Sequence, residues 1–322
     1  MRRRWVVALS IVAFGVAPLL LFAYWRETRV APLPSGLRGT LIYVSDRLGS
    51  DALFARDLPD GADRRLTYFT EAIREPALSP DARRVAFTMG GRVGVVDLPS
   101  GDVRILTLGI DWKDQTPAWR PDGRALVVVA RRPQDATWDL MLLEPLDTTG
   151  QSTGRSPLVA TRGLDETAPV FTPDGKSVVF VREDNLFRVD LAGARTRRLT
   201  GGFRRWRQPA FLPDGRLLGL WQEEKLFGAD VMDADGKNRV ALFEGTTFYR
   251  TLAPAPDGRH FAATFSFDLR FHPMEALRPK HVEEVRLLDA QGQEIAPLLR
   301  SWSTAFRSPQ WAPAPVRGDA DP

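Results

Sequence analysis

The sequence predicts an all-β protein, a six-bladed β-propeller preceded by one N-terminal transmembrane helix. Three observations support this prediction. A Pro-Asp-Gly turn recurs along the chain, short apolar runs flank each copy, and a long apolar run precedes the first copy. A ring of seven blades is the alternative to six.

The repeat is clearest at residues 168–175, which read Ala-Pro-Val-Phe-Thr-Pro-Asp-Gly. Proline sets the backbone angle of the first turn position, aspartate bonds to nearby amides, and glycine accepts a positive φ. Related octapeptides start at residues 75, 116, 208 and 251, and residues 308–315 keep only the first half. The second prolines of the six copies lie at 80, 121, 173, 213, 256 and 313. Repeats of about 40–45 residues built from short strands are typical of propellers.

The apolar run covers residues 5–25 and is interrupted only by Ser10, Gly15 and Pro18. About 20 such residues span a bilayer as a helix, and three preceding arginines predict a cytoplasmic N-terminus. A cleaved signal peptide is the alternative, although no small-residue cleavage site follows the run. We therefore expect a cytoplasmic end at residues 1–4, a membrane helix at 5–25 and a tether at 26–39. The rest is expected in the periplasm, as part of a single-pass protein of a bacterial inner membrane.

Residues 40–315 read as strands and turns, with four strands in each repeat. In the fourth repeat we expect strands at residues 169–172, 177–181, 186–190 and 197–200, with an Asp-x-x-Gly turn between the last two. The chain enters this region at a strand (41–45) that lacks a preceding first strand, and it leaves with a lone first strand (308–312). The two incomplete repeats add up to one blade, so the last strand is predicted to close the ring and remove two open edges. Residues 316–322 are expected to form a disordered tail.

The pattern x-Pro-x-aromatic-Ser/Thr-Pro-Asp-Gly, followed by a strand and Arg-Leu-Thr, resembles the TolB-type propeller repeat. The first repeat, which includes residues 42–49 and 64–67, is especially similar. The resemblance covers residues 40–313 and implies a fold, whereas propellers serve both as binding modules and as domains of enzymes. TolB carries an additional α/β domain before its propeller, and residues 26–39 are too few for one. We therefore expect a relative of this repeat family and not TolB itself.

Composition excludes several classes of site and partner. The sequence has no cysteine, which excludes disulfides, thiolate metal sites and cysteine nucleophiles. The net charge of +4 resides in residues 1–30, and the remainder holds 39 basic and 39 acidic residues. A neutral body does not have the positive charge that nucleic-acid binding requires, so no nucleic-acid partner is expected.

An enzymatic role is the less favoured alternative. Of the three histidines, His272 and His281 lie in an insertion at residues 266–284 that also contains glutamates. Propellers resembling oligogalacturonate lyases hold a metal with histidines, so a metal-dependent glycan-active enzyme is one alternative. We expect these histidines to be solvated loop residues, with no metal and no cofactor. The sequence has no Gly-x-Ser-x-Gly nucleophile motif, and we expect no catalytic residues.

The loops of the predicted blades differ between the two faces of the ring. Connections from second to third strands and from one blade to the next share a face, and they gather aromatic residues and arginines. These residue types are enriched at binding hot spots. We therefore predict a non-enzymatic scaffold that binds protein partners of the cell envelope through this face; a periplasmic ligand sensor is a second alternative. The expected contact residues are Trp112, Arg204, Arg205, Trp206, Phe271, His272 and Trp302. The competing interpretation is that these rings pack between blades.

Overall fold

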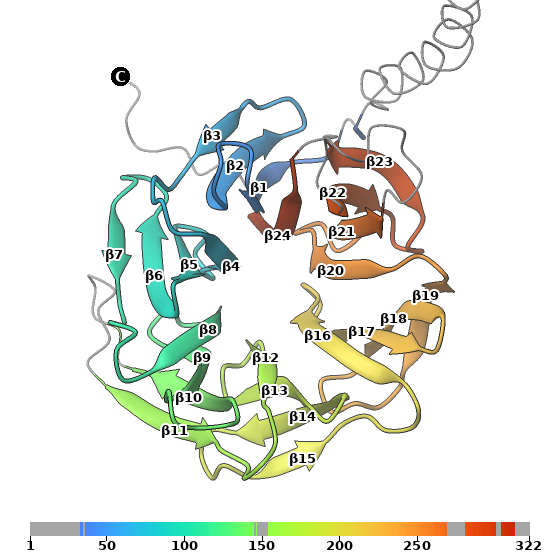
Figure 1. The fold of residues 1–322 in the computed structure, drawn as a ribbon. Coiled ribbons are helices and arrows are strands. Elements are labelled where there is room, and N and C mark those ends of the chain that lie inside the picture. Colours follow the sequence, from blue (N-terminus) through green and yellow to red (C-terminus); the bar gives the residue numbers. More distant parts are fainter. Residues whose placement is uncertain are drawn as a thin grey trace, which may run out of the picture.

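The computed structural model describes residues 33–34, 36–144, 146, 154–268, 281–300 and 304–312. They form six four-stranded antiparallel sheets arranged as blades of a ring (Figure 1). The prediction of an all-β six-bladed propeller is therefore confirmed. No helix among the described residues is long and apolar enough to cross a membrane. The helix predicted at residues 5–25 lies outside them.

Each blade has one strand near the axis and three further strands outward from it. From inside outward, blade 1 contains β24 (Phe306–Ala312), β1 (Gly39–Ser45), β2 (Ala52–Leu58) and β3 (Asp63–Arg65). Blade 2 contains β4 (Ile73–Leu78), β5 (Arg84–Met89), β6 (Arg92–Asp97) and β7 (Val103–Ile105). Blade 3 contains β8 (Lys113–Trp119), β9 (Leu126–Arg131), β10 (Asp139–Leu143) and β11 (Arg155–Val159).

The other three blades follow the same order. Blade 4 contains β12 (Thr167–Phe171), β13 (Ser177–Arg182), β14 (Asn185–Asp190) and β15 (Thr196–Arg198). Blade 5 contains β16 (Arg205–Phe211), β17 (Leu217–Glu223), β18 (Leu226–Met232) and β19 (Val240–Gly245). Blade 6 contains β20 (Tyr249–Pro254), β21 (Phe261–Asp268), β22 (His281–Leu288) and β23 (Glu294–Leu299). The insertion predicted at residues 266–284 is therefore partly strand: Ser266–Asp268 belong to β21 and His281–Glu284 to β22, so the prediction that His281 is a loop residue is wrong. Residues 269–280 are not among those described.

The first and last parts of the chain meet in blade 1. Strand β24 pairs antiparallel with β1, from Thr40 opposite Ala312 to Ser45 opposite Phe306. The C-terminal strand is therefore the innermost strand of a blade whose other strands come from the N-terminal part (Figure 1). This confirms the predicted ring closure.

Local hydrogen bonds explain why the Ser/Thr-Pro-Asp-Gly motif turns the chain. The Asp174 carboxylate accepts a hydrogen bond from the Thr172 hydroxyl at 2.6 Å and from the Lys176 amide at 3.0 Å. The Gly175 amide donates to the Thr172 carbonyl at 2.8 Å, and Gly175 has a φ of +67°. Glycine adopts this left-handed conformation without the steric cost of a Cβ atom. The threonine and aspartate side chains therefore form hydrogen bonds that hold the turn, and the glycine permits its backbone conformation.

A threonine just after the outer strand binds that part of the chain to the third strand. It belongs to Arg-Leu-Thr at residues 65–67 and 198–200 and to Ile-Leu-Thr at residues 105–107. Its hydroxyl accepts a hydrogen bond from a backbone amide near the start of the third strand. The pairs are Thr67 with Leu53 at 3.0 Å, Thr107 with Val93 at 2.9 Å and Thr200 with Leu186 at 2.9 Å. A buried amide would otherwise lack an acceptor at the point where the short outer strand ends.

The core consists of side chains packed between neighbouring sheets. The largest fully buried side chains include Trp206, Trp221, Tyr43, Phe87 and Phe180. One buried cluster combines residues of blades 6 and 1, including Leu41, Ala262 and Trp311. Packing therefore joins each blade to the next and holds the loops between them in place.

Candidate partner-binding surface

The two ends of the propeller carry different connections. Because neighbouring strands are antiparallel, the loops between second and third strands emerge at the same end as the loops that join successive blades. We call this end the loop face. The opposite end, which carries the Pro-Asp-Gly and Asp-x-x-Gly turns, is the turn face.

Exposed large apolar side chains gather on the loop face. Seven such side chains occur among the described residues, and six of them lie in loop-face connections or at the first residue after one. They are Leu48, Tyr68, Leu108, Ile110, Phe203 and Leu226. The most exposed is Phe203, at 91%. The seventh, Val240, follows the turn between β18 and β19 on the turn face. An apolar set on one face is the pattern expected of a surface that another molecule covers.

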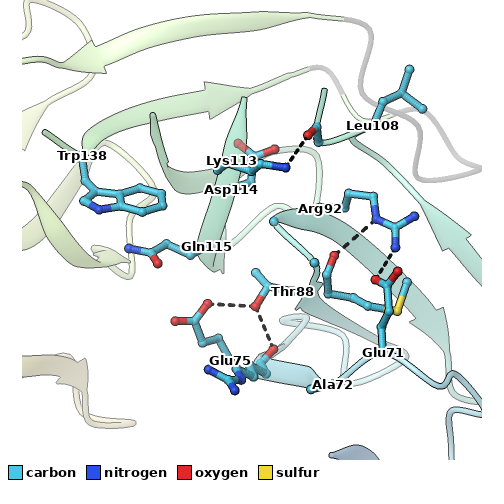
Figure 2. A pocket seen from close by; sticks show the side chains of 15 residues that line it. Glu71, Ala72, Glu75, Thr88, Arg92, Leu108, Lys113, Asp114, Gln115 and Trp138 are labelled. Carbon is cyan, nitrogen blue, oxygen red and sulfur yellow. Dashed lines mark hydrogen bonds and ion pairs between the residues drawn. The ribbon is translucent and has the colours of Figure 1, made fainter. Parts of the chain in front are cut away.

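A hollow of about 710 Å³ lies on the loop face where blades 2 and 3 meet (Figure 2). Its lining combines apolar, acidic and basic side chains from strands and loops of both blades. They include Arg74 and Glu75 of β4 and the loop residues Leu108 and Trp138. Figure 2 shows the Trp138 ring beside Gln115, on the side of the hollow away from Leu108. Such a mixture suits a polar ligand that also presents apolar groups.

Hydrogen bonds and ion pairs set the positions of the charged groups in this hollow. The Glu75 carboxylate accepts hydrogen bonds from the Thr88 hydroxyl at 2.9 Å and from the Thr116 amide at 2.7 Å. Glu71 pairs with Arg92, and the Lys113 ammonium donates to the Gly109 carbonyl at 2.9 Å. Because Thr116 belongs to the next blade, Glu75 also links the inner strands β4 and β8. The hollow therefore has pre-organised polar walls.

A second hollow, of about 600 Å³, lies on the loop face of blade 5. Phe203, Arg205, Gln222, Glu223 and Glu224 line it. Arg205 is 71% exposed and lies 3.7 Å from the Asp184 carboxylate of the neighbouring blade. This hollow places an exposed aromatic ring beside an exposed guanidinium, which is a combination typical of interface hot spots.

The predicted contact residues near blade 5 have three different environments. Arg205 is exposed as described, whereas the Arg204 guanidinium donates to Asp230 at 2.7 Å and lies 3.7 Å from the centre of the Trp221 ring. Trp206 is completely buried in a cluster with Leu186 and other residues of blades 4 and 5. Trp206 therefore belongs to the core, as the competing interpretation held, and the proposal that it contacts a partner is withdrawn. The reason is alternation along β16, which turns successive side chains to opposite faces of the sheet.

Of the remaining predicted residues, only Trp112 is among those that the structure describes. Trp112 is partly buried and packs against the core of blade 3, and the guanidinium groups of Arg132 and Arg155 lie 5.5 Å and 5.1 Å from its ring centre. Phe271, His272 and Trp302 lie outside the described residues. The structure therefore brings Arg204 and Arg205 together with Phe203 and places Trp112 at a separate point of the ring.

Sequence reasoning did not single out several residues of this surface. Leu48, Leu108 and Ile110 lie in loops and Leu226 is the first residue of β18, and their exposure depends on the packing of neighbouring blades. A count of apolar residues in loop-face connections alone would have found them. Trp138 was missed because the loop that carries it has no counterpart of equal length in the other described blades.

One acidic side chain between blades 3 and 4 is unusual. Glu166 is completely buried, and its carboxylate oxygens accept no hydrogen bond from the described residues. Its nearest cation is Arg182, whose guanidinium nitrogen lies 3.6 Å away. Burial raises the pKa of Glu166, and the nearby hydroxyl and amide groups of Thr161 and the Arg182 charge oppose this effect. Within the described ranges, no group of three or more histidine, cysteine, aspartate or glutamate residues could hold a metal ion.

Comparisons with known proteins agree with this fold. No family model matches the chain. A protein TolB homolog of Chlorobium luteolum is 28% identical over 163 residues, which cover 49% of this chain and 35% of that protein. A Tol-Pal system protein TolB of Anaeromyxobacter dehalogenans is 30% identical over 210 residues, which cover 57% of this chain and 45% of that protein. The chain thus matches less than half the length of these relatives.

Solved structures show the same architecture at low identity. TolB from Acinetobacter baumannii superposes with a TM-score of 0.69 at 18% identity, over 90% of this chain and 70% of that chain. An oligogalacturonate lyase in complex with manganese gives 0.58 at 16% identity, over 80% of this chain and 73% of that chain. The fold and the repeat define a six-bladed β-propeller built from Pro-Asp-Gly repeats. Within that class, the partial matches to TolB proteins and the fold shared with solved TolB structures support a TolB-like β-propeller.

Proposed function

We propose that this protein is a non-enzymatic scaffold that binds a protein partner of the bacterial cell envelope through the loop face of its propeller. The observation that carries the proposal is the position of the exposed apolar side chains, since six of the seven described lie on that face. Two hollows with aromatic and charged walls lie among them. Interface cores favour aromatic residues and arginine over lysine and glutamate.

The proposal places the propeller in the periplasm, held at the inner membrane by a helix at residues 5–25. The support for the helix is the apolar run behind three arginines. The support for an envelope role is the similarity to proteins named after the Tol-Pal system. A reporter enzyme that is active only after export, fused behind the propeller, tests the orientation. We expect an active fusion, and an active cytoplasmic reporter at the same position would contradict it.

Site-directed variants test the binding face. Tyr68→Ala and Phe203→Ala each remove an exposed ring on the loop face, and the matched control Val240→Ala removes an exposed apolar side chain on the turn face. Partners recovered with the membrane-extracted protein should fall at least fivefold for the double loop-face variant and remain unchanged for the control. Equal recovery from both would contradict the proposal, provided that circular dichroism shows the same fold.

An enzyme of the metal-dependent lyase type is the alternative that the same purified protein can test. Such an enzyme requires a bound metal ion, whereas a scaffold does not. Metal analysis of the full chain should therefore find less than stoichiometric metal. A stoichiometric transition metal that is lost when His272 and His281 are both replaced by alanine would favour the enzyme.

A further inference from the structure

Arginine recurs at one repeat position on the inner strands. The position lies six residues before the second proline of each repeat, and we call the six residues there the inner rim. In blade order they are Arg307, Arg74, Gln115, Thr167, Arg207 and Arg250. Blades 5, 6, 1 and 2, which follow one another around the ring, therefore each contribute an arginine (Figure 1).

Acidic neighbours neutralise part of this arc. Arg307 contacts Glu283 and lies 2.7 Å from the Asp51 carboxylate, so its charge is compensated within the protein. Arg250 lies 3.0 Å from the other carboxylate oxygen of Glu283, so Arg250 and Arg307 share the single negative charge of Glu283. The Arg250 side chain remains 56% exposed, which leaves its guanidinium accessible for a further contact.

Arg207 has no comparable contact with a carboxylate among the described residues. It forms no ion pair with a described carboxylate, and its buried Nε atom finds no hydrogen-bond acceptor. Its guanidinium lies 4.7 Å from the centre of the Phe248 ring. Burial lowers the pKa of Arg207, the nearby positive charge of Arg250 lowers it further, and the negative charge of Asp184 opposes these effects. A half-buried guanidinium beside a like charge is costly unless an anion satisfies it.

We propose that Arg207 and Arg250 bind a carboxylate of an acidic polypeptide segment seated at the inner rim. This inference rests on the proposed function and specifies the chemistry of the partner. The planar guanidinium group matches a carboxylate in two-point hydrogen bonding, and stacking on Phe248 keeps one such group in place. The carboxylate of the segment supplies the ion-pair partner that no described carboxylate provides to Arg207.

The surroundings favour a polypeptide over a small free anion. Two residues before Arg207 on the same strand, Arg205 lines the hollow that also exposes Phe203. A segment that carries both acidic and apolar side chains would occupy the rim and this hollow at once. A small dicarboxylate or inorganic phosphate would satisfy only the arginines.

Peptide binding to the full chain in detergent tests this proposal. The probes are a fluorescent peptide of alternating glutamate and leucine and a matched peptide of alternating glutamine and leucine. We expect the acidic peptide to bind at least tenfold more tightly, with an affinity that falls as salt is raised. Arg207→Gln and Arg250→Gln should each weaken the acidic peptide at least fivefold and leave the glutamine peptide unaffected.

Arg259→Gln is the matched control, because Arg259 is an exposed arginine in a turn of the opposite face. An equal loss in this variant, or equal binding of the two peptides, would overturn the proposal. Glutarate and inorganic phosphate serve as competitors. If either displaces the peptide at the peptide's own concentration, the site takes a small anion and the polypeptide is the wrong occupant.

The outcomes distinguish this inference from the proposed function. If Phe203→Ala reduces partner recovery while Arg207→Gln leaves the acidic peptide bound, the loop face binds a partner and the carboxylate site is wrong. Thermal unfolding of each variant checks that the fold is retained.

Discussion

At the residue scale, Asp63 shows how charge contributes to stability at a blade edge. Its carboxylate accepts hydrogen bonds from Arg56 Nε and from Arg47, both at 2.6 Å. Arg56 also donates to the Leu298 carbonyl of blade 6 at 3.0 Å. Burial alone would raise the pKa of Asp63, but the hydrogen bonds from Arg56 and Arg47 lower it to about 2. The ionised form is therefore the one that stabilises the junction of blades 1 and 6.

Asp63→Asn should lower the free energy of unfolding at pH 7 by about 2 kcal/mol, since each unit of pKa shift corresponds to about 1.4 kcal/mol. A depressed pKa contributes stability above the ordinary value of 3.8, and this contribution is lost as the pH falls towards about 2. Urea unfolding at several pH values measures the difference between wild type and variant. A difference that stays constant from pH 7 to pH 3 would contradict this assignment.

The pKa of Glu166 is shifted in the opposite direction to that of Asp63. Because its pKa is raised, the unfolded chain releases the proton at a lower pH than the native protein does. Stability is therefore fully present below the ordinary glutamate pKa and is lost as the pH rises through the native value. Glu166→Gln should raise the free energy of unfolding near pH 8 by about 1 kcal/mol, a typical figure for relieving a poorly satisfied buried polar group. The gain should vanish below pH 4, and the exposed control Glu224→Gln should show no change at either pH.

At the element scale, the repeated turn offers a matched pair of substitutions. Ala82 occupies the position of the turn glycine in blade 2 and has a φ of +55°, whereas Gly175 has +67° in blade 4. A non-glycine residue in this region carries steric strain of about 1 kcal/mol. Ala82→Gly should therefore stabilise the protein by about 0.5 kcal/mol, after the entropy cost of glycine, and Gly175→Ala should destabilise it by about 1 kcal/mol. Differential scanning calorimetry checks both, and shifts of equal sign would contradict the strain argument.

The closing strand β24 is a second element with a clear test. Trp311 is buried between blades 6 and 1, and its indole nitrogen donates to the Arg38 carbonyl at 3.2 Å. Trp311→Ala should cost about 3–5 kcal/mol because it leaves a large cavity. Its partly exposed neighbour Gln310→Ala should change stability by less than about 0.5 kcal/mol. Deleting residues 306–322 removes the strand and should lower the melting temperature sharply. An unchanged melting temperature would refute closure by this strand.

The same elements show how far the sequence alone could be interpreted. The turn motif predicted the end of each inner strand, because the hydrogen bonds that form the turn lie within six consecutive residues. The pairing of β24 with β1 was predictable from two incomplete repeats, although more than 250 residues separate them in sequence. The environments of Trp206 and Arg204 were not predictable, since they depend on which face of β16 meets blade 4 and on the Asp230 of another strand. Local sequence patterns thus predict the strands and turns, whereas the environment of a site residue depends on contacts with strands that are distant in sequence.

At the scale of the whole molecule, the two faces of the ring differ in their connections and in their exposed side chains. The turn face is built mainly from short hydrogen-bonded turns, and its exception is the longer connection between β10 and β11 in blade 3. The loop face carries the connections of unequal length, most of the described exposed apolar side chains and the arginine arc of the inner rim. A rigid ring that displays varied loops on one side is suited to binding, because the scaffold holds the loops in place at little entropic cost.

Site-specific photo-crosslinking in intact cells tests this central claim most directly. A photo-crosslinking amino acid placed at Phe203 or at Leu108 reports on the loop face, and the same amino acid placed at Val240 reports on the turn face. Defined adducts of the same partner should form from both loop-face positions and not from Val240. Adducts of that partner from Val240, with none from Phe203 and Leu108, would show that the turn face binds and would contradict the account.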